Sequence, residues 1–280
     1  MGKKNLNLVE AQTQLPNIYA PRSRPKPKKT PLKEMSLLNI LKRTKTYTNI
    51  VAVGDIHGKT AELGYRIKTR YTIKNSVIFL CGDIGVGFNK PNYHIEEFTK
   101  LNNIAKGLNN IIIVIRGNHD DPSYFDGSFN KWSNIAFVPD YTLVETASHK
   151  VLCIGGGISI DRTNRTLGRS YWANEVSVYD EDKLKAAGVI DIIMTHSAPS
   201  FCEPITKDGI MGWAKYDDKL LVDCDIDRQV FDDVWKFIKA DNQNPLYWCY
   251  GHFHMSRSQE YDNTKFKAID ELEFFPLTLL

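Results

Sequence analysis

Five short motifs hold five of the seven histidines in this chain, together with Asp and Asn residues but no Cys. In chain order they are Gly54-Asp55-Ile56-His57-Gly58, Gly82-Asp83, Gly117-Asn118-His119-Asp120, Thr195-His196 and Gly251-His252-Phe253-His254. Carboxylate oxygen, amide oxygen and imidazole nitrogen are ligands for borderline to hard divalent metal ions. Two such ions side by side suit displacement at phosphorus, because they lower the pKa of a water and neutralise phosphoryl oxygens. The motifs therefore predict hydrolysis of a phosphoester by a metal-activated water.

Each motif follows an apolar run that predicts a buried strand. These runs are Ile50–Gly54, Ser76–Cys81, Asn110–Arg116, Val189–Thr195 and Leu246–Tyr250. Helical spacing over Thr60–Arg70 and Pro91–Leu108 separates the first three runs, which predicts parallel strands joined by helical crossovers. Residues at the carboxyl ends of such strands converge on one edge of a sheet. The five motifs are therefore expected to meet in space.

The rest of the chain predicts more strands and fewer helices. Further strands are expected at Ile135–Phe137, Tyr141–Glu145, Val151–Ile154 and Lys265–Ile269, and further helices at Asp180–Ala187 and Asp225–Lys239. We predict an α/β fold in which two mixed β-sheets pack face to face with α-helices outside. Residues 36–280 are expected to form this single domain.

A role for each motif residue follows from its chemistry. One metal ion is assigned Asp55, His57, Asp83 and His254, and the other Asp83, Asn118, His196 and His252, with the Asp83 carboxylate bridging the two. His119 is not needed as a ligand and can protonate the leaving oxygen. Asp120 is the candidate for orienting the His119 ring.

The motif series resembles the calcineurin-like metallophosphoesterase superfamily, whose pattern is D-x-H, G-D, G-N-H-D/E, H and G-H-x-H. The resemblance covers about Ile50 to His254. It implies a four-layer α/β/β/α sandwich and a dinuclear centre that usually contains Mn, Fe, Zn or a mixture. We expect two divalent ions, with manganese as the first choice, and Fe, Zn, Ni and Co as alternatives because the same ligands accept them.

The second motif departs from the Ser/Thr protein phosphatase branch, which continues as G-D-x-x-D-R-G. Here Val86 stands in place of the acid and Gly87 in place of the phosphate-binding Arg. The paired His254 is typical of the wider phosphoesterase and phosphodiesterase branches, and the stretch from Gly155 to Trp172 resembles a segment of small bacterial and phage-type members of the superfamily. We therefore expect a phosphodiesterase, or a phosphatase acting on a small molecule or nucleotide, and keep the protein phosphatase as the alternative.

A glycine-rich stretch, Gly155-Gly156-Gly157, precedes the candidate substrate-binding residues. Arg162 or Arg165 can hold a phosphate oxygen through a planar guanidinium, and Trp172 can stack on a base. The alternative is that these arginines pair with Asp161 or Glu175 within the loop. His94 and His149 lie outside the motifs and are expected at the surface, and the acidic residues Asp223, Asp225 and Asp227 are expected at the start of a helix.

Charge and composition bound the remaining possibilities. Residues 1–35 hold eight Lys or Arg against two Glu, a net charge of +6, whereas the whole chain carries +3, so residues 36–280 carry −3. This Pro-containing segment is expected to be a disordered or loosely docked arm: either a solubilising tail or a tether to nucleic acid. A non-catalytic, metal-stabilised binding module that uses this arm is the rival from another class. Five Cys without paired spacing and the lack of a long apolar run predict a cytoplasmic protein that does not enter membranes.

Overall fold

The computed structural model describes residues 31–202 and 208–277, which contain two β-sheets. The first sheet contains β1 (Asn49–Val53), β2 (Ser76–Cys81), β3 (Ile111–Ile115), β4 (Ile135–Phe137) and β11 (Phe274–Pro276). The second contains β5 (Thr142–Glu145), β6 (Lys150–Ile154), β7 (Ile192–Thr195), β8 (Tyr247–Tyr250), β9 (Arg257–Tyr261) and β10 (Thr264–Ala268). Both sheets are mixed.

Strand order explains how the motifs meet. The first sheet has the order β11-β1-β2-β3-β4, and β1 through β4 are parallel. The second has the order β5-β6-β7-β8-β10-β9, in which β6, β7, β8 and β10 are parallel. The parallel arrangement predicted for the first three strands is therefore confirmed. It places the carboxyl ends of β1, β2 and β3 at one edge of their sheet, and those of β7 and β8 at one edge of theirs.

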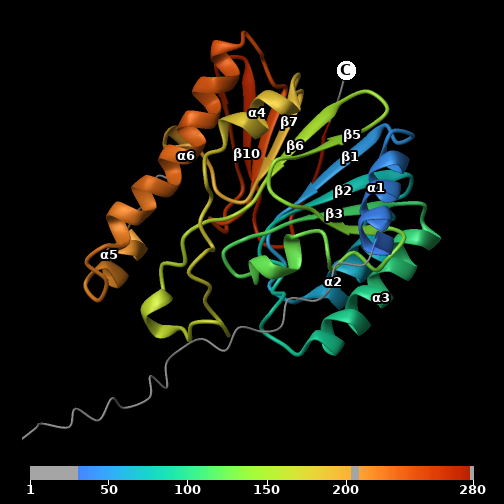
Figure 1. The fold of residues 1–280 in the computed structure, drawn as a ribbon, viewed down its shortest axis with the longest axis horizontal. Helices are drawn as coiled ribbons and strands as arrows, with labels where there is room; N and C mark the ends of the chain where they lie inside the picture. The colour runs from blue at the N-terminus through green and yellow to red at the C-terminus, as the bar shows by residue number, and fades with distance from the viewer. Residues whose placement is uncertain (1–30, 203–207, 278–280) are drawn as a thin grey trace, which may run out of the picture.

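Helices cover the outer faces of both sheets (Figure 1). The helices within the described residues are α1 (Pro31–Thr44), α2 (Thr60–Tyr65, continued by a π-helical turn at Arg66–Arg70), α3 (Pro91–Gly107), α4 (Glu181–Ala187), α5 (Asp208–Ala214) and α6 (Leu220–Ala240), with 3₁₀ turns at Pro122–Phe125, Arg162–Asn164 and Ser200–Cys202. Helix α1 instead contacts the edge strands β4 and β5, and its Ile40 belongs to the core between the sheets. One core packs α2 and α3 against the first sheet, with Leu63 and Leu101 beside Ile78. Another packs α4 and α6 against the second sheet, with Leu184 and Phe231 beside Trp248.

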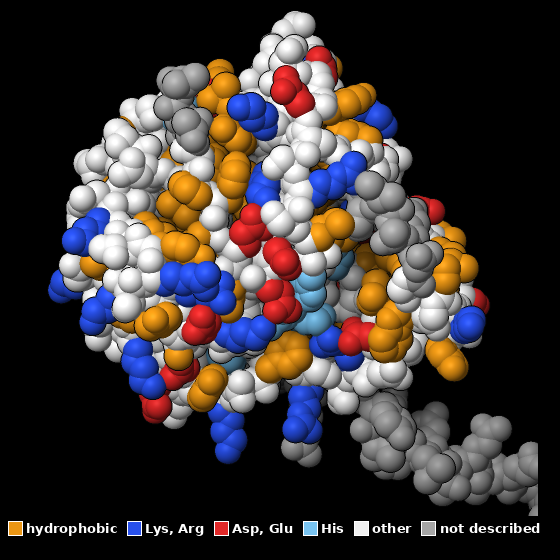
Figure 2. Space-filling view, turned by 180° about the vertical axis from the view of Figure 1, so that it is seen from behind, with side chains coloured by type: hydrophobic (Ala, Val, Ile, Leu, Met, Phe, Trp, Pro, Cys, Tyr) orange, Lys and Arg blue, Asp and Glu red, His pale blue; other side chains and the backbone are white. Residues whose placement is uncertain are grey.

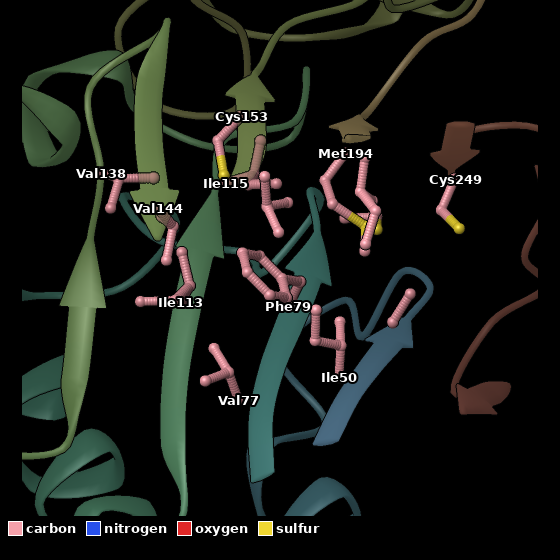
Figure 3. Close-up of a cluster of buried hydrophobic side chains, with 14 of the residues drawn as sticks. Ile50, Val77, Phe79, Ile113, Ile115, Val138, Val144, Cys153, Met194 and Cys249 are labelled. Carbon is pink, nitrogen blue, oxygen red and sulfur yellow. The ribbon is translucent and has the colours of Figure 1, made fainter. Parts of the chain in front are cut away.

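The central core lies between the two sheets (Figure 3). Phe79 and Ile113 of the first sheet meet Val151, Met194 and Cys249 of the second, and all five are buried. Burial of apolar side chains at about 25 cal/mol per Å² is the main force that holds such layers together. The order helix, sheet, sheet, helix confirms the predicted fold class.

Several boundaries differ from the expectations. Residues 1–30 of the predicted arm (residues 1–35) lie outside the described residues. Residues 31–35, also assigned to the arm, instead form the first part of α1. The helix expected from Asp225 begins at Leu220, and α5, β9 and β11 were not predicted. Each of the five cysteines is a free thiol, and four of them are buried. None of the helices within residues 31–202 and 208–277 has the length and apolar character needed to cross a bilayer.

Candidate metal centre

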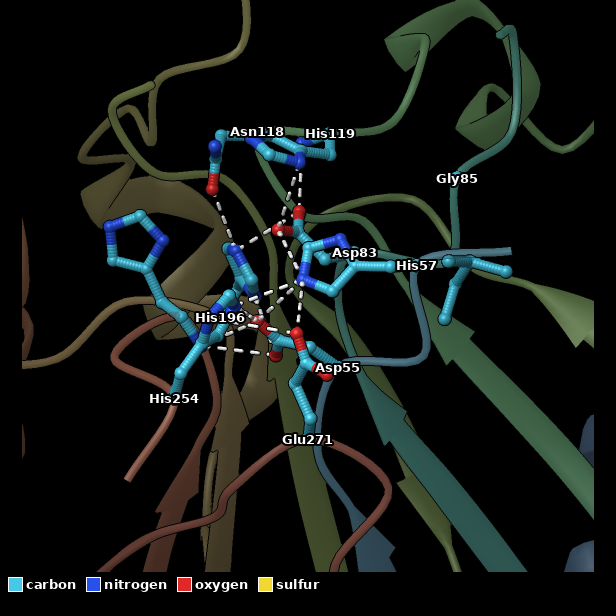
Figure 4. A network of polar contacts seen from close by, with 12 residues as sticks. Asp55, His57, Asp83, Gly85, Asn118, His119, His196, His254 and Glu271 are labelled. Atoms are coloured by element: carbon cyan, nitrogen blue, oxygen red, sulfur yellow. Dashed lines mark hydrogen bonds and ion pairs between the residues drawn. The ribbon is translucent and has the colours of Figure 1, made fainter. Parts of the chain in front are cut away.

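The five motifs converge where the carboxyl ends of the two sheets meet (Figure 4). Asp55 and His57 follow β1, Asp83 follows β2, and Asn118 follows β3. His196 follows β7, and His252 and His254 follow β8. All seven predicted ligands are therefore brought together, four from the first sheet and three from the second.

The first predicted ligand set forms a tight cluster. Asp55, His57, Asp83 and His254 each present a ligand atom, and these four atoms lie within 4.8 Å of one another. The Nε2 atoms of His57 and His254 are 2.9 Å apart, and Asp55 Oδ2 is 3.1 Å from His254 Nε2. Lone pairs aimed at one point repel unless a proton or a cation lies between them. The donor set therefore fits a divalent cation.

The second set centres on the buried ring of His196. Its Nδ1–H donates to the carbonyl of Cys81 at 2.7 Å, which fixes the tautomer and leaves Nε2 as the ligand atom. That Nε2 lies 2.8 Å from Asn118 Oδ1 and 3.2 Å from Asp83 Oδ1. The His252 ring packs beside it, with ring centroids 4.8 Å apart. An imidazole nitrogen and two oxygens facing one another again fit a cation.

Asp83 contributes one carboxylate oxygen to each set. Its Oδ1 faces His196, and its Oδ2 is 4.0 Å from His57 Nε2. The backbone N–H of His119 also donates to Oδ1 at 2.7 Å, which helps to hold the carboxylate in place. This arrangement suits the bridging role expected for Asp83.

The backbone turns sharply at the motifs. His57, Asp83, His252 and His254 have φ between 42° and 69°, in the left-handed region that non-glycine residues seldom adopt. Such conformations persist where the surrounding structure holds them and are frequent at functional sites. Only glycine fits at position 251, because a Cβ there would collide with the Asp55 carboxylate. The left-handed backbone conformations and the close approach of the Gly251 backbone to Asp55 thus both help to direct ligand atoms toward the centre.

The site concentrates opposite charges in a buried place. Burial disfavours the charged His196 ring, but the carboxylates of Asp83 and Asp55 outweigh it and raise its pKa to about 10. Burial and the neighbouring His196 hold the pKa of His252 well below its usual value. Burial alone would raise the pKa of Asp83, yet the surrounding histidines hold it well below the usual range. These shifts show that the buried carboxylates are stabilised by a positive charge placed among them.

His119 lies at the mouth of the cluster. Its Nδ1 is 3.7 Å from Asp83 Oδ2, and its ring centroid is 5.3 Å from that of His57. Burial lowers its pKa, and the neighbouring Arg165 lowers it further against the opposing effect of Asp83. A phosphoryl dianion beside the ring would favour the protonated form again. The ring therefore lies beside both ligand sets and lines the adjoining cavity.

Asp120 takes a different role from the one expected. Its buried carboxylate accepts hydrogen bonds from the backbone N–H groups of Gly117, Ile84, Gly85 and Val86, at 2.7 to 3.1 Å. Its position after Asn118-His119 made it the candidate for orienting His119, but these contacts tie the loop after β3 to the loop after β2. The side chain thus holds the two ligand loops in register.

The predicted substrate-binding residues are occupied by internal contacts. Arg162 makes ion pairs with Asp217 and Asp223, and Arg165 pairs with Asp161, as the alternative had it for Arg165. Trp172 is 7% exposed and packs edge-on against Phe88. These partners were not predictable for Arg162, because Asp217 and Asp223 are distant in sequence.

Sequence reasoning missed two carboxylates near the centre. Glu271 Oε1 is 3.7 Å from both His57 Nε2 and His254 Nδ1. Glu175 accepts from the N–H and hydroxyl of Ser159, and Asn118 Nδ2 donates to that hydroxyl at 3.0 Å. This second chain of contacts fixes the Asn118 amide so that Oδ1 faces His196. Neither Glu lies in a recognisable motif: Glu271 was not singled out from the sequence, and Glu175 was considered only as a partner of the loop arginines.

Two further expectations are corrected. His94, expected at the surface, is 4% exposed, and its Nε2 accepts a hydrogen bond from the Gly87 N–H. Asp227, expected in the first turn of a helix, lies in the body of α6 because that helix starts earlier, and it is buried. The burial of both side chains is determined by their position in the fold rather than by the local sequence.

Comparison with known proteins identifies the family. The model of the calcineurin-like phosphoesterase family matches residues 48–256, which include every predicted metal ligand. The chain therefore belongs to this family, and membership indicates hydrolysis of a phosphoester at a dinuclear metal centre. The identity of the metal and the substrate are separate questions.

Individual relatives are distant. The serine/threonine-protein phosphatase 6 catalytic subunit of Drosophila melanogaster is 27% identical over 125 residues, 40% of this chain and 40% of that protein. Among solved structures, the protein TT1561 of Thermus thermophilus is 14% identical, with 81% of this chain and 91% of that chain covered and a TM-score of 0.48. A novel archaeal phosphodiesterase is 12% identical, with 83% and 100% covered and a TM-score of 0.35.

Proposed function

We propose that this protein hydrolyses the phosphoester of a small molecule, as a phosphodiesterase or a small-molecule or nucleotide phosphatase. The observation that carries the proposal is the convergence of the two ligand sets on Asp83, with His119 beside them. When bound, a pair of divalent cations would supply Lewis acidity and a water of lowered pKa. Asp55, His57, Asp83 and His254 would hold one cation, and Asp83, Asn118, His196 and His252 the other.

The chain's own residues would do the rest. The Cys81 carbonyl orients the His196 ring, and the Ser159 hydroxyl orients the Asn118 amide. His119 would hold a proton on its ring and donate it to the leaving oxygen, a contribution typically worth about 10²–10⁴ in rate. We propose residues 36–280, together with the start of α1, as one domain that performs this reaction.

The geometry around Gly87 argues against the protein phosphatase alternative. A Cβ at Gly87 would lie 2.5 Å from Asp121 Cβ and 2.8 Å from Trp172 Cζ2, so the phosphate-binding Arg of that branch has no room here. Val86 likewise contributes a buried apolar side chain where that branch has an acid. At these two positions the chain therefore lacks the acid and the arginine of the protein phosphatase branch.

The test is to strip the protein with chelator, reload it with manganese, and measure hydrolysis of a chromogenic phosphodiester and a phosphomonoester side by side. Metal-dependent turnover of either supports the proposal, and the preferred one assigns the subclass. Absence of turnover of both, with two metal ions bound per chain, would favour the binding-module rival. Binding of DNA and RNA by the full chain and by a chain lacking residues 1–30, at two salt concentrations, tests the tethering role of the arm.

A further inference from the structure

A cavity of about 460 Å³ opens directly beside the metal centre. One wall consists of Asp83, Asn118, His119, His252 and His254, so the cavity is continuous with the place where a phosphoryl group would lie. Its size is that of a site for a small organic molecule. Figure 2 shows histidine side chains reaching the surface on this face, with acidic, basic and hydrophobic side chains around them.

The rest of the lining is a second wall that combines apolar and charged side chains, and its apolar part comes from separate segments of the chain. Ile158 and Ile160 come from the loop after β6, Ile210 and Trp213 from α5, Leu221 from α6 and Phe253 from the last motif. Ile160 and Leu221 are 37% and 38% exposed, so both offer apolar surface that a ligand in the cavity could cover. The Arg162 ion pairs to Asp217 and Asp223 join the loop after β6 to the start of α6.

The charged side chains of this wall are mostly acidic. Among the described residues that line the cavity outside the metal centre, the carboxylates of Asp161, Asp225 and Asp227 accompany one cationic side chain, Arg228. Asp161 is paired with Arg165, and the Arg228 guanidinium lies 4.4 Å from the Phe253 ring centroid. Asp225 is exposed, and its carboxylate would repel a second phosphate or another anion here.

We propose that this cavity binds the alcohol portion of the substrate and selects phosphoesters whose alcohol is apolar and carries no negative charge. The inference rests on the proposed function, because it requires the phosphoryl group to lie at the metal centre. It predicts that aryl or long-chain alkyl phosphoesters are preferred substrates. Nucleoside diphosphates, polyphosphates and nucleic acids are disfavoured, because further phosphates would face the acidic wall.

The first experiment measures binding without catalysis. Calorimetry with 1-naphthylmethylphosphonate, which is not hydrolysed, compares the manganese-loaded wild type with Leu221→Gln and Val222→Gln. Val222 is the neighbouring residue on α6, is 59% exposed and does not line the cavity, so it is the matched control. We expect Leu221→Gln to weaken binding at least five-fold and Val222→Gln to leave it unchanged. Equal affinities in the two variants would overturn the proposal.

The second experiment tests the charge of the wall. The ratio of kcat/KM for 1-naphthyl phosphate to that for its ring-sulfonated counterpart is compared in the wild type, Asp225→Lys and Asp218→Lys. Asp218 is exposed and lies outside the cavity lining. We expect the wild type to prefer the uncharged alcohol at least ten-fold, and Asp225→Lys alone to reduce that preference. A wild type that prefers the sulfonated alcohol would overturn the inference.

The two experiments separate this inference from the proposed function. Protein that binds the phosphonate in a Leu221-dependent manner but hydrolyses no phosphoester would refute the function and retain the binding site. Protein that hydrolyses phosphoesters with no dependence on Leu221 or Asp225 would retain the function and refute the site.

Discussion

His119 is the motif histidine whose position outside both ligand sets gives it a separate role. Because its ring faces the cavity and approaches Asp83 without joining a ligand set, His119→Ala should remove proton donation and leave the metal ligands intact. We expect turnover to fall by about 10²–10⁴. Measurement of kcat together with metal content per chain checks this, with His149→Ala as a control far from the centre. Loss of metal from His119→Ala would show that the residue is a ligand.

The buried carboxyl group of Glu175 should make the stability of the folded protein depend on pH. Burial raises the pKa of Glu175 to about 7, so its ionisation in the folded protein is unfavourable compared with the unfolded chain. Because the folded state holds this proton more tightly, the free energy of unfolding should fall as pH rises from about 4.5 to 7, by up to about 3 kcal/mol.

The comparison with Glu175→Gln isolates this effect. The unfolding free energy of metal-free wild type minus that of the variant should decrease between pH 5 and pH 8 in urea titrations. The exposed Glu96→Gln is the control for simple loss of a charge. A difference that stays constant across this pH range would contradict the role given to Glu175 burial.

At the scale of elements, Arg162 joins the glycine-rich loop to the start of α6. Its guanidinium is 15% exposed and pairs with Asp217, which is 11% exposed, so removal leaves a poorly solvated carboxylate. We expect Arg162→Ala to lower the free energy of unfolding by about 1–3 kcal/mol. Denaturation curves check this, with Arg169→Ala, an exposed arginine of the same loop, as control. Unchanged stability combined with a raised KM would restore Arg162 to the substrate-binding role predicted from sequence.

The strands were predictable because their apolar runs are dense and end at turn residues. Ser76–Cys81 and Ile135–Phe137 have the predicted bounds, and the ends of β1, β3, β7 and β8 lie within a few residues of prediction. The edge strand β9 was missed because its sequence, Arg257–Tyr261, is polar and largely exposed, so it carries no apolar signal. The early start of α6 was missed because Asp223 and Asp225 resemble a helix N-terminus, whereas the helix already includes Leu220.

At the scale of the whole molecule, the ligands come from both sheets. Asp55, Asp83 and Asn118 follow strands of the first sheet, and His196 and His252 follow strands of the second. A metal ion held by ligands from both sheets would cross-link the sandwich, and because it would bind the folded state only, it would stabilise that state. At a free concentration about 1,000 times the Kd, one site contributes about 4 kcal/mol.

We therefore expect the melting temperature to rise when the stripped protein is reloaded with manganese. Calorimetric scans of the stripped and reloaded protein measure this, and His254→Ala should reduce the shift. An identical melting temperature with and without metal would argue that the two sheets are not linked through the centre.

The metal-ligand positions were predictable as a set because each motif sits behind a strand and the strands are parallel. What the sequence could not provide was the surroundings of that set. The partners of Arg162, the burial of Asp227 and the approach of Glu271 and Glu175 depend on contacts between segments far apart in the chain. The apolar wall of the cavity likewise combines the loop after β6 with α5 and α6. The substrate preference proposed above therefore depends on contacts that only the structure shows.

Asp83 lies between the two ligand sets, and the proposed phosphoester hydrolysis depends on it to organise both. The most direct test is Asp83→Asn, with metal content per chain, turnover of the preferred chromogenic phosphoester and the circular dichroism spectrum measured on the same preparation. The amide keeps the size of the side chain but removes the charge that two cations would share. We expect Asp83→Asn to fold, to bind less metal per chain and to show no measurable turnover. Near-normal turnover by correctly folded Asp83→Asn would contradict it.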